Sequence, residues 1–277
     1  MLKDLDKLMR LNRLPHIWCP GCGNGIIMKA IMEAINECGL DQNKTVVVSG
    51  IGCSSRASGY LNFDTLHTAH GRAITFATGV KLARPELNVF VVTGDGDGSA
   101  IGGNHLIHAA RRNIDLNVIM FNNNIYGMTG GQYSPMTPQG KLATTSPYGN
   151  LERSFDICKL AEAAGATYVG RSTVYHVKLL ESLIKNAIKN KGFSFVEAIS
   201  LCPISYGRRN KLGDAPKMMA WLKEHAVNIK AAKKMEPEKL EGRFLIGEMQ
   251  QKQAPEYTQL YDELIAKLQK GAGENGR

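Results

Sequence analysis

Signals for membrane insertion and export are missing from this sequence of 277 residues. It has no run of about 18 apolar residues, the length that a transmembrane helix needs. Its N-terminal segment, MLKDLDKLMR, alternates charged residues with leucine and contains no apolar signal core. These absences predict a cytoplasmic protein that does not associate with a membrane.

Signals for nucleic-acid binding are also scarce. The net charge is +9, but the lysines and arginines are scattered and form no basic block. The sequence has no run of aromatic residues on which bases can stack. The positive charge fits either an ordinary solvated surface or an acidic protein partner attracted by the field. We expect no nucleic-acid partner.

Between residues 44 and 202, short β-branched runs alternate with amphipathic segments. This alternation predicts a doubly wound α/β fold with a mostly parallel sheet. Strands are expected at 44–50, 87–94, 116–121, 166–170 and 193–199, and helices at 25–40, 71–83, 102–113, 154–165 and 175–191.

The character of the sequence changes after residue 207. The remaining segment is charged, strand-poor and partly helical, and it is too thin to form a core of its own. We therefore divide the chain into an α/β domain, 1–207, and a C-terminal extension, 208–277, which packs on the domain or on a partner subunit.

Unusual residues follow four of the expected strands. The strand ends lead to Cys53, to Asp95 among glycines, to the asparagine run 122–124 and to Cys202. In a parallel sheet these ends lie on one edge, and open α/β sheets bind their ligands there. We therefore expect residues that are far apart in the sequence to form one site.

The glycine-rich segment VFVVTGDGDGSAIGG, residues 89–103, does not match the common binding loops. A calcium loop that starts at Asp95 requires glycine at its sixth position and glutamate at its twelfth, where Ala100 and Leu106 stand. The glycine spacing also fails the dinucleotide fingerprint, and no Gly-Lys-Ser/Thr follows, which excludes a P-loop.

A magnesium–diphosphate site fits this segment together with the asparagine run. Mg²⁺ prefers oxygen ligands and leaves positions for phosphate oxygens. Asp95 can supply a carboxylate, Asn123 an amide oxygen and Ile125 a backbone carbonyl. Gly94 and Gly96 let the backbone approach the phosphates, and the N–H groups of the following helix start can bind them. Taken singly, each half also fits an ordinary turn.

The six cysteines include one close pair, Cys19 and Cys22 in WCPGCGNG. Disulfides are uncommon in the cytoplasm, so metal binding is favoured. A four-cysteine zinc site usually contains a second close pair, whereas one pair with the remote Cys53 and Cys202 fits a [4Fe–4S] cluster. Zinc remains the alternative. The other two cysteines lie on apolar helix stripes and are expected in the core.

The Gly-Asp-Gly segment followed by paired asparagines resembles the thiamine diphosphate motif. Together with the cysteines, it makes the chain similar to the β subunits of 2-oxoacid:ferredoxin oxidoreductases, most of all those of the 2-oxoglutarate type. The matching stretches, within residues 18–210, are WCPGCGNG, GIGCSSR, HTAHGRAITFATGVKLARPE, TGDGDGSAIGGNH, NNNIYGMTGGQYSP and CPISYGRRN.

This resemblance implies the thiamine diphosphate-binding fold and a defined reaction. The enzyme decarboxylates 2-oxoglutarate oxidatively with coenzyme A as co-substrate to give succinyl-CoA, or fixes CO₂ in reverse. Electrons pass singly through the [4Fe–4S] cluster to ferredoxin. Pyruvate and branched-chain 2-oxoacids are the alternative substrates. A thiamine enzyme without a cluster and a zinc-knuckle protein that binds nucleic acid are the competing classes.

The resemblance also implies a partner and a set of site residues. The chain holds one α/β domain, so an obligate α subunit is expected to supply the glutamate beside the aminopyrimidine, in an (αβ)₂ assembly. Cys19, Cys22, Cys53 and Cys202 are the implied cluster ligands, and Asp95, Asn123 and Ile125 the implied Mg²⁺ ligands. The implied cofactor-binding residues are Gly52, Ser54, His70, Gly71, Gly94, Asp95, Gly96, Asp97, Asn123, Ile125, Gly127, Met128 and Thr129.

Two residues are expected to act on the substrate. The resemblance places His70 beside the cofactor, and a helix cap with a surface histidine is the alternative. Arg56 can pair with the distal carboxylate of 2-oxoglutarate, because arginine binds carboxylates bidentately. An arginine at the cluster or at a subunit interface fits Arg56 equally well.

Overall fold

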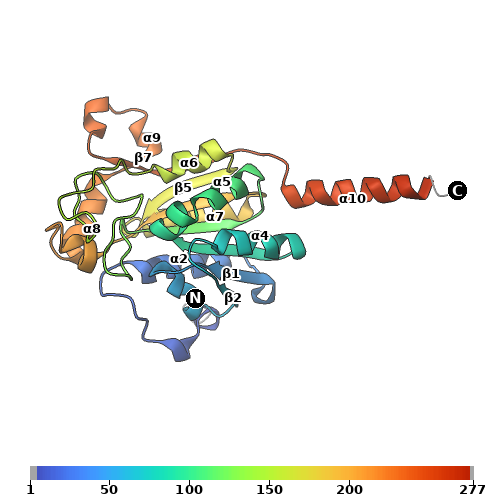
Figure 1. The fold of residues 1–277 in the computed structure, drawn as a ribbon, viewed down its shortest axis with the longest axis horizontal. Helices are drawn as coiled ribbons and strands as arrows, with labels where there is room; N and C mark the ends of the chain where they lie inside the picture. Colours follow the sequence, from blue (N-terminus) through green and yellow to red (C-terminus); the bar gives the residue numbers. More distant parts are fainter. Residues whose placement is uncertain (1–4, 275–277) are drawn as a thin grey trace.

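The strands of the computed structural model, which describes residues 5–274, form one eight-stranded sheet (Figure 1). The strand order is β2-β1-β3-β4-β6-β5-β8-β7. The strands are β1 (Thr45–Ser49), β2 (Asp64–His67), β3 (Asn88–Gly94), β4 (Asn117–Asn122), β5 (Tyr168–Thr173), β6 (Ser194–Ile199), β7 (Ala226–Asn228) and β8 (Phe244–Gln251). β1 to β6 pair in parallel, whereas β8 runs antiparallel to β5. The predicted fold class is confirmed.

Helices cover both faces of the sheet. α2 and α7 pack on one face, and α4, α5 and α6 on the other. The helices are α2 (Asn24–Glu37), α3 (Ala57–Tyr60), α4 (Ala73–Ala83), α5 (Gly103–Arg111), α6 (Ile157–Ala164), α7 (Val177–Lys189), α8 (Ala215–His225), α9 (Ile229–Ala232) and α10 (Tyr257–Glu274). Short helical turns include η4 (Ser54–Arg56), η5 (Asp97–Ile101) and η6 (Pro203–Gly207).

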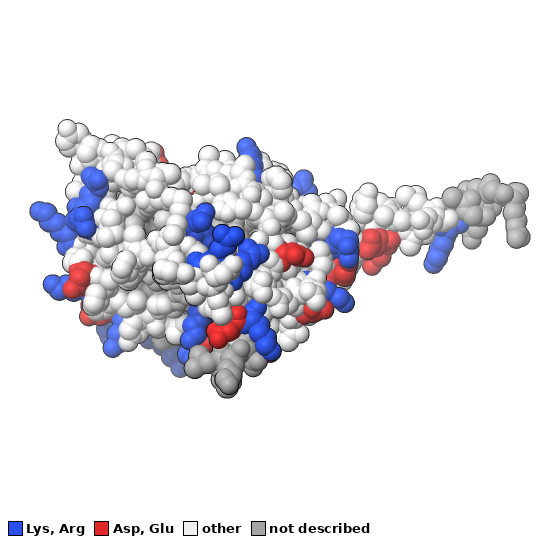
Figure 2. Space-filling model, turned by 90° about the horizontal axis from the view of Figure 1, so that it is seen from below, with Lys and Arg blue, Asp and Glu red and all other residues white. Residues whose placement is uncertain are grey.

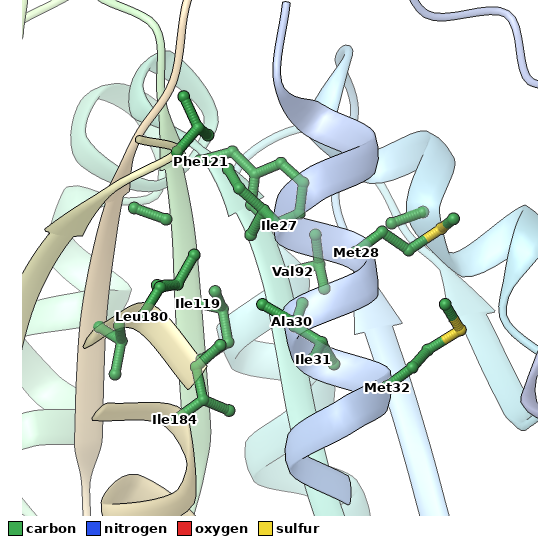
Figure 3. Packing of buried hydrophobic residues seen from close by; sticks show 14 of the residues in the cluster. Ile27, Met28, Ala30, Ile31, Met32, Val92, Ile119, Phe121, Leu180 and Ile184 are labelled. Atoms are coloured by element: carbon green, nitrogen blue, oxygen red, sulfur yellow. The ribbon is translucent and has the colours of Figure 1, made fainter. Parts of the chain in front are cut away.

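The core divides into two layers because successive strand residues point to opposite faces. In β1, Val47 packs in the layer beneath α2, whereas Val46 and Val48 pack in the layer beneath α4. Figure 3 shows the first layer, in which apolar side chains of α2 lie against strand residues and against α7. The labelled residues are Ile27, Met28, Ala30, Ile31, Met32, Val92, Ile119, Phe121, Leu180 and Ile184.

The structure adds three strands that the sequence did not predict. β2 is a short, largely exposed edge strand with few apolar residues to mark it. β7 and β8 come from the extension after residue 207, which was expected to be strand-poor. β8 joins the sheet through β5, with a register shift between Val169 and Gly170. The domain boundary at 207 stays a prediction.

The surface agrees with the scattered charge of the sequence. On the face drawn in Figure 2, lysine and arginine side chains lie in several separate groups. α10 projects away from the body of the molecule (Figure 1). Over residues 5–274, no helix combines the length and hydrophobicity required to cross a membrane.

Candidate active site

Two adjoining cavities lie at the carboxyl edge of the sheet, where β1, β3, β4 and β6 end. The larger has a volume of about 520 Å³ and the smaller about 270 Å³. Their shared lining consists of Asn24, Cys53, Asn123, Gly127 and Met128. The predicted convergence of remote residues on one edge is therefore present in the fold.

Most residues predicted to bind the cofactor line the larger cavity. They are Gly52, Ser54, His70, Gly94, Asp95, Gly96, Asp97, Asn123, Ile125, Gly127, Met128 and Thr129. Within the described residues, Gly71 and Arg56 are not part of this lining. The Gly71 N–H instead donates to Asp97 at 2.7 Å. The Arg56 Nε is buried and has no hydrogen-bond partner among residues 5–274.

Three oxygen-bearing groups converge in the larger cavity. One end of the Asn123 side-chain amide lies 3.2 Å from Asp95 Oδ1 and 2.7 Å from the Ile125 carbonyl oxygen. With nitrogen at this end, the amide donates to both oxygens. With oxygen there, the amide faces two further acceptors, and both distances are close to the spacing of about 2.9 Å between adjacent ligands on octahedral Mg²⁺. The first orientation satisfies the chain alone, and the second suits a bound cation, so the donor set fits Mg²⁺.

The electrostatics of Asp95 also favour a cation. Asp95 is 3% exposed, and burial raises its pKa to about 7. The Ser134 hydroxyl donates to Oδ2 at 2.5 Å and opposes this rise in pKa. In the described part of the chain, no lysine, arginine or histidine forms an ion pair with Asp95. An ionised carboxylate in such a position is costly unless a positive charge compensates it.

Asp97 organises the loops around the cavity. Its Oδ2 accepts from the Thr93 hydroxyl at 2.7 Å, and its Oδ1 accepts from the Gly71 N–H and, at 3.2 Å, the Ile51 N–H. The Nδ1 of His70 also lies 2.8 Å from Oδ1, although this contact does not have hydrogen-bond geometry. Three protein groups therefore donate to the oxygens of Asp97, and its predicted contact with the cofactor stays a prediction.

Buried polar atoms without partners also point into this region. Among residues 5–274, Asn24 Oδ1 and Ser54 Oγ have no hydrogen-bond partner, although both residues are buried and line the larger cavity. Such groups are costly unless a ligand or water satisfies them. Both therefore fit the polar end of a bound cofactor.

The four cysteines predicted to ligate a cluster all line the smaller cavity. Burial and the neighbouring thiols raise the pKa of Cys53 to about 11 and also raise that of Cys22. The described residues contain no group of three or more His, Cys, Asp or Glu side chains that converges as a single ion requires. Thiols spread around a cavity suit a cubane cluster better than tetrahedral zinc, whose sulfurs lie about 2.3 Å from one ion.

The surroundings of the thiols are closely packed. A Cβ added at Gly127 would lie 3.5 Å from both Cys53 Sγ and Cys202 Sγ. The Trp18 indole donates to the Cys53 carbonyl at 2.6 Å. Of the two cysteines expected in the core, Cys158 is 1% exposed and Cys38 is half-buried at the end of α2.

Several site residues were missed by the sequence reasoning. Asn24, Ile51, Ile101, Phe121, Tyr126, Gln132 and Ser134 belong to them. Asn24 and Tyr126 stand inside quoted motif stretches and only lacked an assigned role. Ser134 also stands inside a quoted stretch, NNNIYGMTGGQYSP, but its hydrogen bond to Asp95 spans 39 positions and is not visible in that stretch.

Gly96 provides a direct test of packing at the site. A Cβ there would lie 2.3 Å from the Tyr126 ring, whose hydroxyl donates to the Gly96 carbonyl at 2.9 Å. We expect Gly96→Ala to lower stability by about 1–3 kcal/mol through overpacking and to weaken cofactor binding. Thermal unfolding and thiamine diphosphate titration of the complex measure both effects.

Gly103→Ala is the matched control. A Cβ at Gly103, at the start of α5, meets nothing within 4 Å. Alanine there is expected to be neutral, or stabilising by up to about 1 kcal/mol through helix propensity. Equal behaviour of the two variants would contradict the packing argument.

The fold and the site define a class of protein. A doubly wound sheet that brings Gly-Asp-Gly and an asparagine turn together at its carboxyl edge is the diphosphate-binding domain of a thiamine diphosphate enzyme. Residues 50–198 match the family model described as "Thiamine pyrophosphate enzyme, C-terminal TPP binding domain".

Comparison with curated and solved proteins narrows the class. The chain is 52% identical to 2-oxoglutarate synthase subunit KorB of Methanothermobacter marburgensis, over 97% of this chain and 93% of the relative. It is 54% identical to the KorB subunit of Methanocaldococcus jannaschii, over 95% and 97%. The structure of 2-oxoglutarate:ferredoxin oxidoreductase from Magnetococcus marinus, with 2-oxoglutarate, coenzyme A and succinyl-CoA bound, matches with a TM-score of 0.85 and 34% identity, covering 95% of this chain and 90% of that one. The chain belongs to the family of 2-oxoglutarate synthase KorB subunits, which confirms the family predicted from its sequence.

Proposed function

We propose that this chain is the β subunit of a 2-oxoglutarate:ferredoxin oxidoreductase, with thiamine diphosphate and Mg²⁺ in the larger cavity and a [4Fe–4S] cluster in the smaller. The enzyme converts 2-oxoglutarate and coenzyme A to succinyl-CoA and CO₂ and passes the electrons singly to ferredoxin, or runs in reverse. The observation that carries the proposal is the shared wall of the two cavities, because it places oxygen ligands and thiols side by side.

The residues that line the larger cavity have separate roles in binding the cofactor. The oxygens of Asp95, Asn123 and Ile125 hold the cation, and the Ser54 hydroxyl is free to donate to a phosphate oxygen. Bound thiamine diphosphate supplies an electron sink for loss of CO₂, and the cluster supplies one-electron steps. Zinc supplies no such steps, because it does not change its oxidation state.

His70 lines the larger cavity and is placed to act beside the cofactor. Its Nδ1 lies 2.8 Å from Asp97 Oδ1, but this contact does not have hydrogen-bond geometry. We propose that Arg56 pairs with the distal carboxylate of the substrate, although it does not line the larger cavity.

The rim of the larger cavity supports a partner subunit. Ile51, Ile101 and Met128 line the cavity and are 38%, 52% and 44% exposed. Large apolar side chains around an opening favour cover by another protein surface. We propose that an α subunit packs here in an (αβ)₂ assembly and supplies the glutamate beside the aminopyrimidine. A cytoplasmic location is part of the proposal, since the six cysteines are unpaired.

The substrate is tested with the assembled αβ complex, assayed without oxygen. With coenzyme A and a viologen dye, we expect reduction with 2-oxoglutarate to exceed that with pyruvate or branched-chain 2-oxoacids by at least about tenfold in kcat/KM, a difference of 1.4 kcal/mol in transition-state binding. Faster reduction with pyruvate would contradict the substrate assignment. Zinc without iron or bound thiamine would contradict the enzyme assignment itself.

A further inference from the structure

We propose that Glu197 is a positioning residue for the cation site, because through Asn122 it fixes the turn that presents Asn123 and the Ile125 carbonyl to Asp95. Glu197 lies on β6 and is 1% exposed. The inference rests on the proposed function, since it assigns Mg²⁺ and thiamine diphosphate to this edge of the sheet.

The two oxygens of Glu197 have different partners. Its Oε2 accepts from Arg171 Nε at 2.5 Å and from the Cys158 thiol at 3.4 Å. Its Oε1 accepts from Asn122 Nδ2 at 2.7 Å. A buried ion pair contributes little to stability compared with apolar residues of similar volume. Because Oε1 is bonded to Asn122 rather than to Arg171, we infer that Glu197 also positions the end of the neighbouring strand β4.

The hydrogen bond from Asn122 decides how its amide is oriented. Since Nδ2 is directed at the carboxylate of Glu197, Oδ1 points the other way and accepts from the Asn124 N–H at 3.0 Å. Asn124 has a φ of 62°, in the left-handed region that asparagine tolerates better than most residues. The turn between β4 and the site thus depends on one amide orientation.

The other side of the turn is also held. The Asn124 carbonyl accepts from the Thr137 hydroxyl at 2.6 Å, and this hydroxyl accepts from the Ser134 N–H at 2.9 Å. Ser134 in turn donates to Asp95. A continuous series of hydrogen bonds therefore runs from Glu197 through the asparagine turn to the carboxylate of Asp95. Partners that orient metal ligands in this way typically change metal affinity by about 10- to 100-fold.

Glu197→Gln tests this assignment. The carbonyl of the new amide pairs with Arg171, so its NH₂ group faces the NH₂ group of Asn122, and the Asn122 amide loses its acceptor. We expect the Mg²⁺ concentration for half-maximal thiamine diphosphate binding to the αβ complex to rise by about 10- to 100-fold. Binding is measured by equilibrium dialysis without substrate. Cys158→Ala is the control, because this thiol contacts Oε2 and the Gly170 carbonyl but not Oε1, so its loss should leave binding unchanged.

The double variant Glu197→Gln/Asn122→Asp separates positioning from general stability. It moves the negative charge from 197 to 122, and the introduced carboxylate accepts both from the glutamine NH₂ and from the Asn124 N–H. We expect Mg²⁺ dependence to return to within about threefold of the parent, a coupling that a double-mutant cycle detects. Asn122→Asp alone should require as much Mg²⁺ for thiamine diphosphate binding as Glu197→Gln does, since two carboxylates then face each other.

Each outcome bears on a different statement. A parent complex that shows no Mg²⁺-dependent binding would overturn the proposed function and this inference with it. If the parent complex binds thiamine diphosphate normally and Glu197→Gln shows the same Mg²⁺ dependence, the inference alone is overturned. The inference is also overturned if the double variant still requires the raised Mg²⁺ concentration. If Glu197→Gln does not assemble, Asn122→Ala keeps the Arg171–Glu197 pair and removes the turn contact, and normal binding by that variant would also overturn the inference.

Discussion

The variant Asp95→Ala is expected to lose thiamine diphosphate while it keeps its iron. Asp95 contributes the charged oxygen of the cation site, and its carboxylate lies 3.2 Å from the Asn123 amide. Without this oxygen, the diphosphate faces two neutral ligands, and Mg²⁺ is not held against it. We expect the affinity for thiamine diphosphate to fall by at least about 100-fold, the upper end of the cost of losing a partner that only orients a ligand.

The iron content separates this effect from misfolding. Asp95 lines the larger cavity, and it is not among the residues that line the cavity of the four thiols in the described part of the chain. Analysis of the purified complex should therefore show that thiamine diphosphate is lost and that iron is retained. Loss of both would mean that the two sites are not independent.

A second substitution removes the charge but keeps the shape. Asp95→Asn should lose the cofactor to a similar degree without a loss of stability in the cofactor-free complex. Burial raises the pKa of Asp95 from 3.8 to about 7, so ionisation costs stability in the folded chain as the pH rises through about 7, and below 3.8 this cost is absent. Asparagine carries no charge at any pH. Asp64→Ala, on the exposed strand β2, is the control and should change neither property.

The convergence of the site was predictable because it depends on the topology of the sheet. The strands that precede Cys53, Asp95 and Asn123 are parallel neighbours, so their ends must share an edge. The short β-branched runs and their glycine-rich ends are visible in the sequence. The local order of the chain therefore carried most of the information about where the cofactor residues lie.

The exact direction of side chains was not predictable in the same way. Arg56 follows Cys53 closely near the rim, and its pairing with the substrate stays a prediction. In the structure Ser54–Arg56 is a short 3-10 turn, which rotates successive residues by about 120°. Ser54 thus lines the larger cavity and Arg56 does not. A rotation of this kind depends on the turn type, and GIGCSSR does not specify it.

Long-range pairings were the other gap. β8, FLIGEMQQ, contains glycine and a polar C-terminal half, and its place beside β5 follows from pairing with an existing edge rather than from a strong strand pattern of its own. The same holds for the surroundings of Asp97, whose contact with the cofactor stays a prediction. Its neighbours Thr93, Gly71 and His70 come together only in the folded chain.

The variant Cys202→Ala is expected to remove the cluster while thiamine diphosphate binding persists. A [4Fe–4S] cluster is held by four thiolates, so the loss of one opens an iron to solvent and oxidation. Cys202 lines the smaller cavity and, within the described residues, not the larger one. We expect iron to fall to the background of the assay. The rate of viologen reduction should fall by at least about 1000-fold, since each 1.36 kcal/mol added to the activation free energy lowers a rate tenfold.

Two other cysteines make this expectation specific. Cys53 lines both cavities, so Cys53→Ala should lower iron and also weaken thiamine diphosphate binding. Cys38 is half-buried at the end of α2 and lines neither cavity among the described residues, so Cys38→Ala should keep both cofactors. The comparison holds the residue type constant and varies only its place in the fold. Full iron in Cys202→Ala, or the same loss in Cys38→Ala, would show that the thiols around the smaller cavity do not hold the cluster.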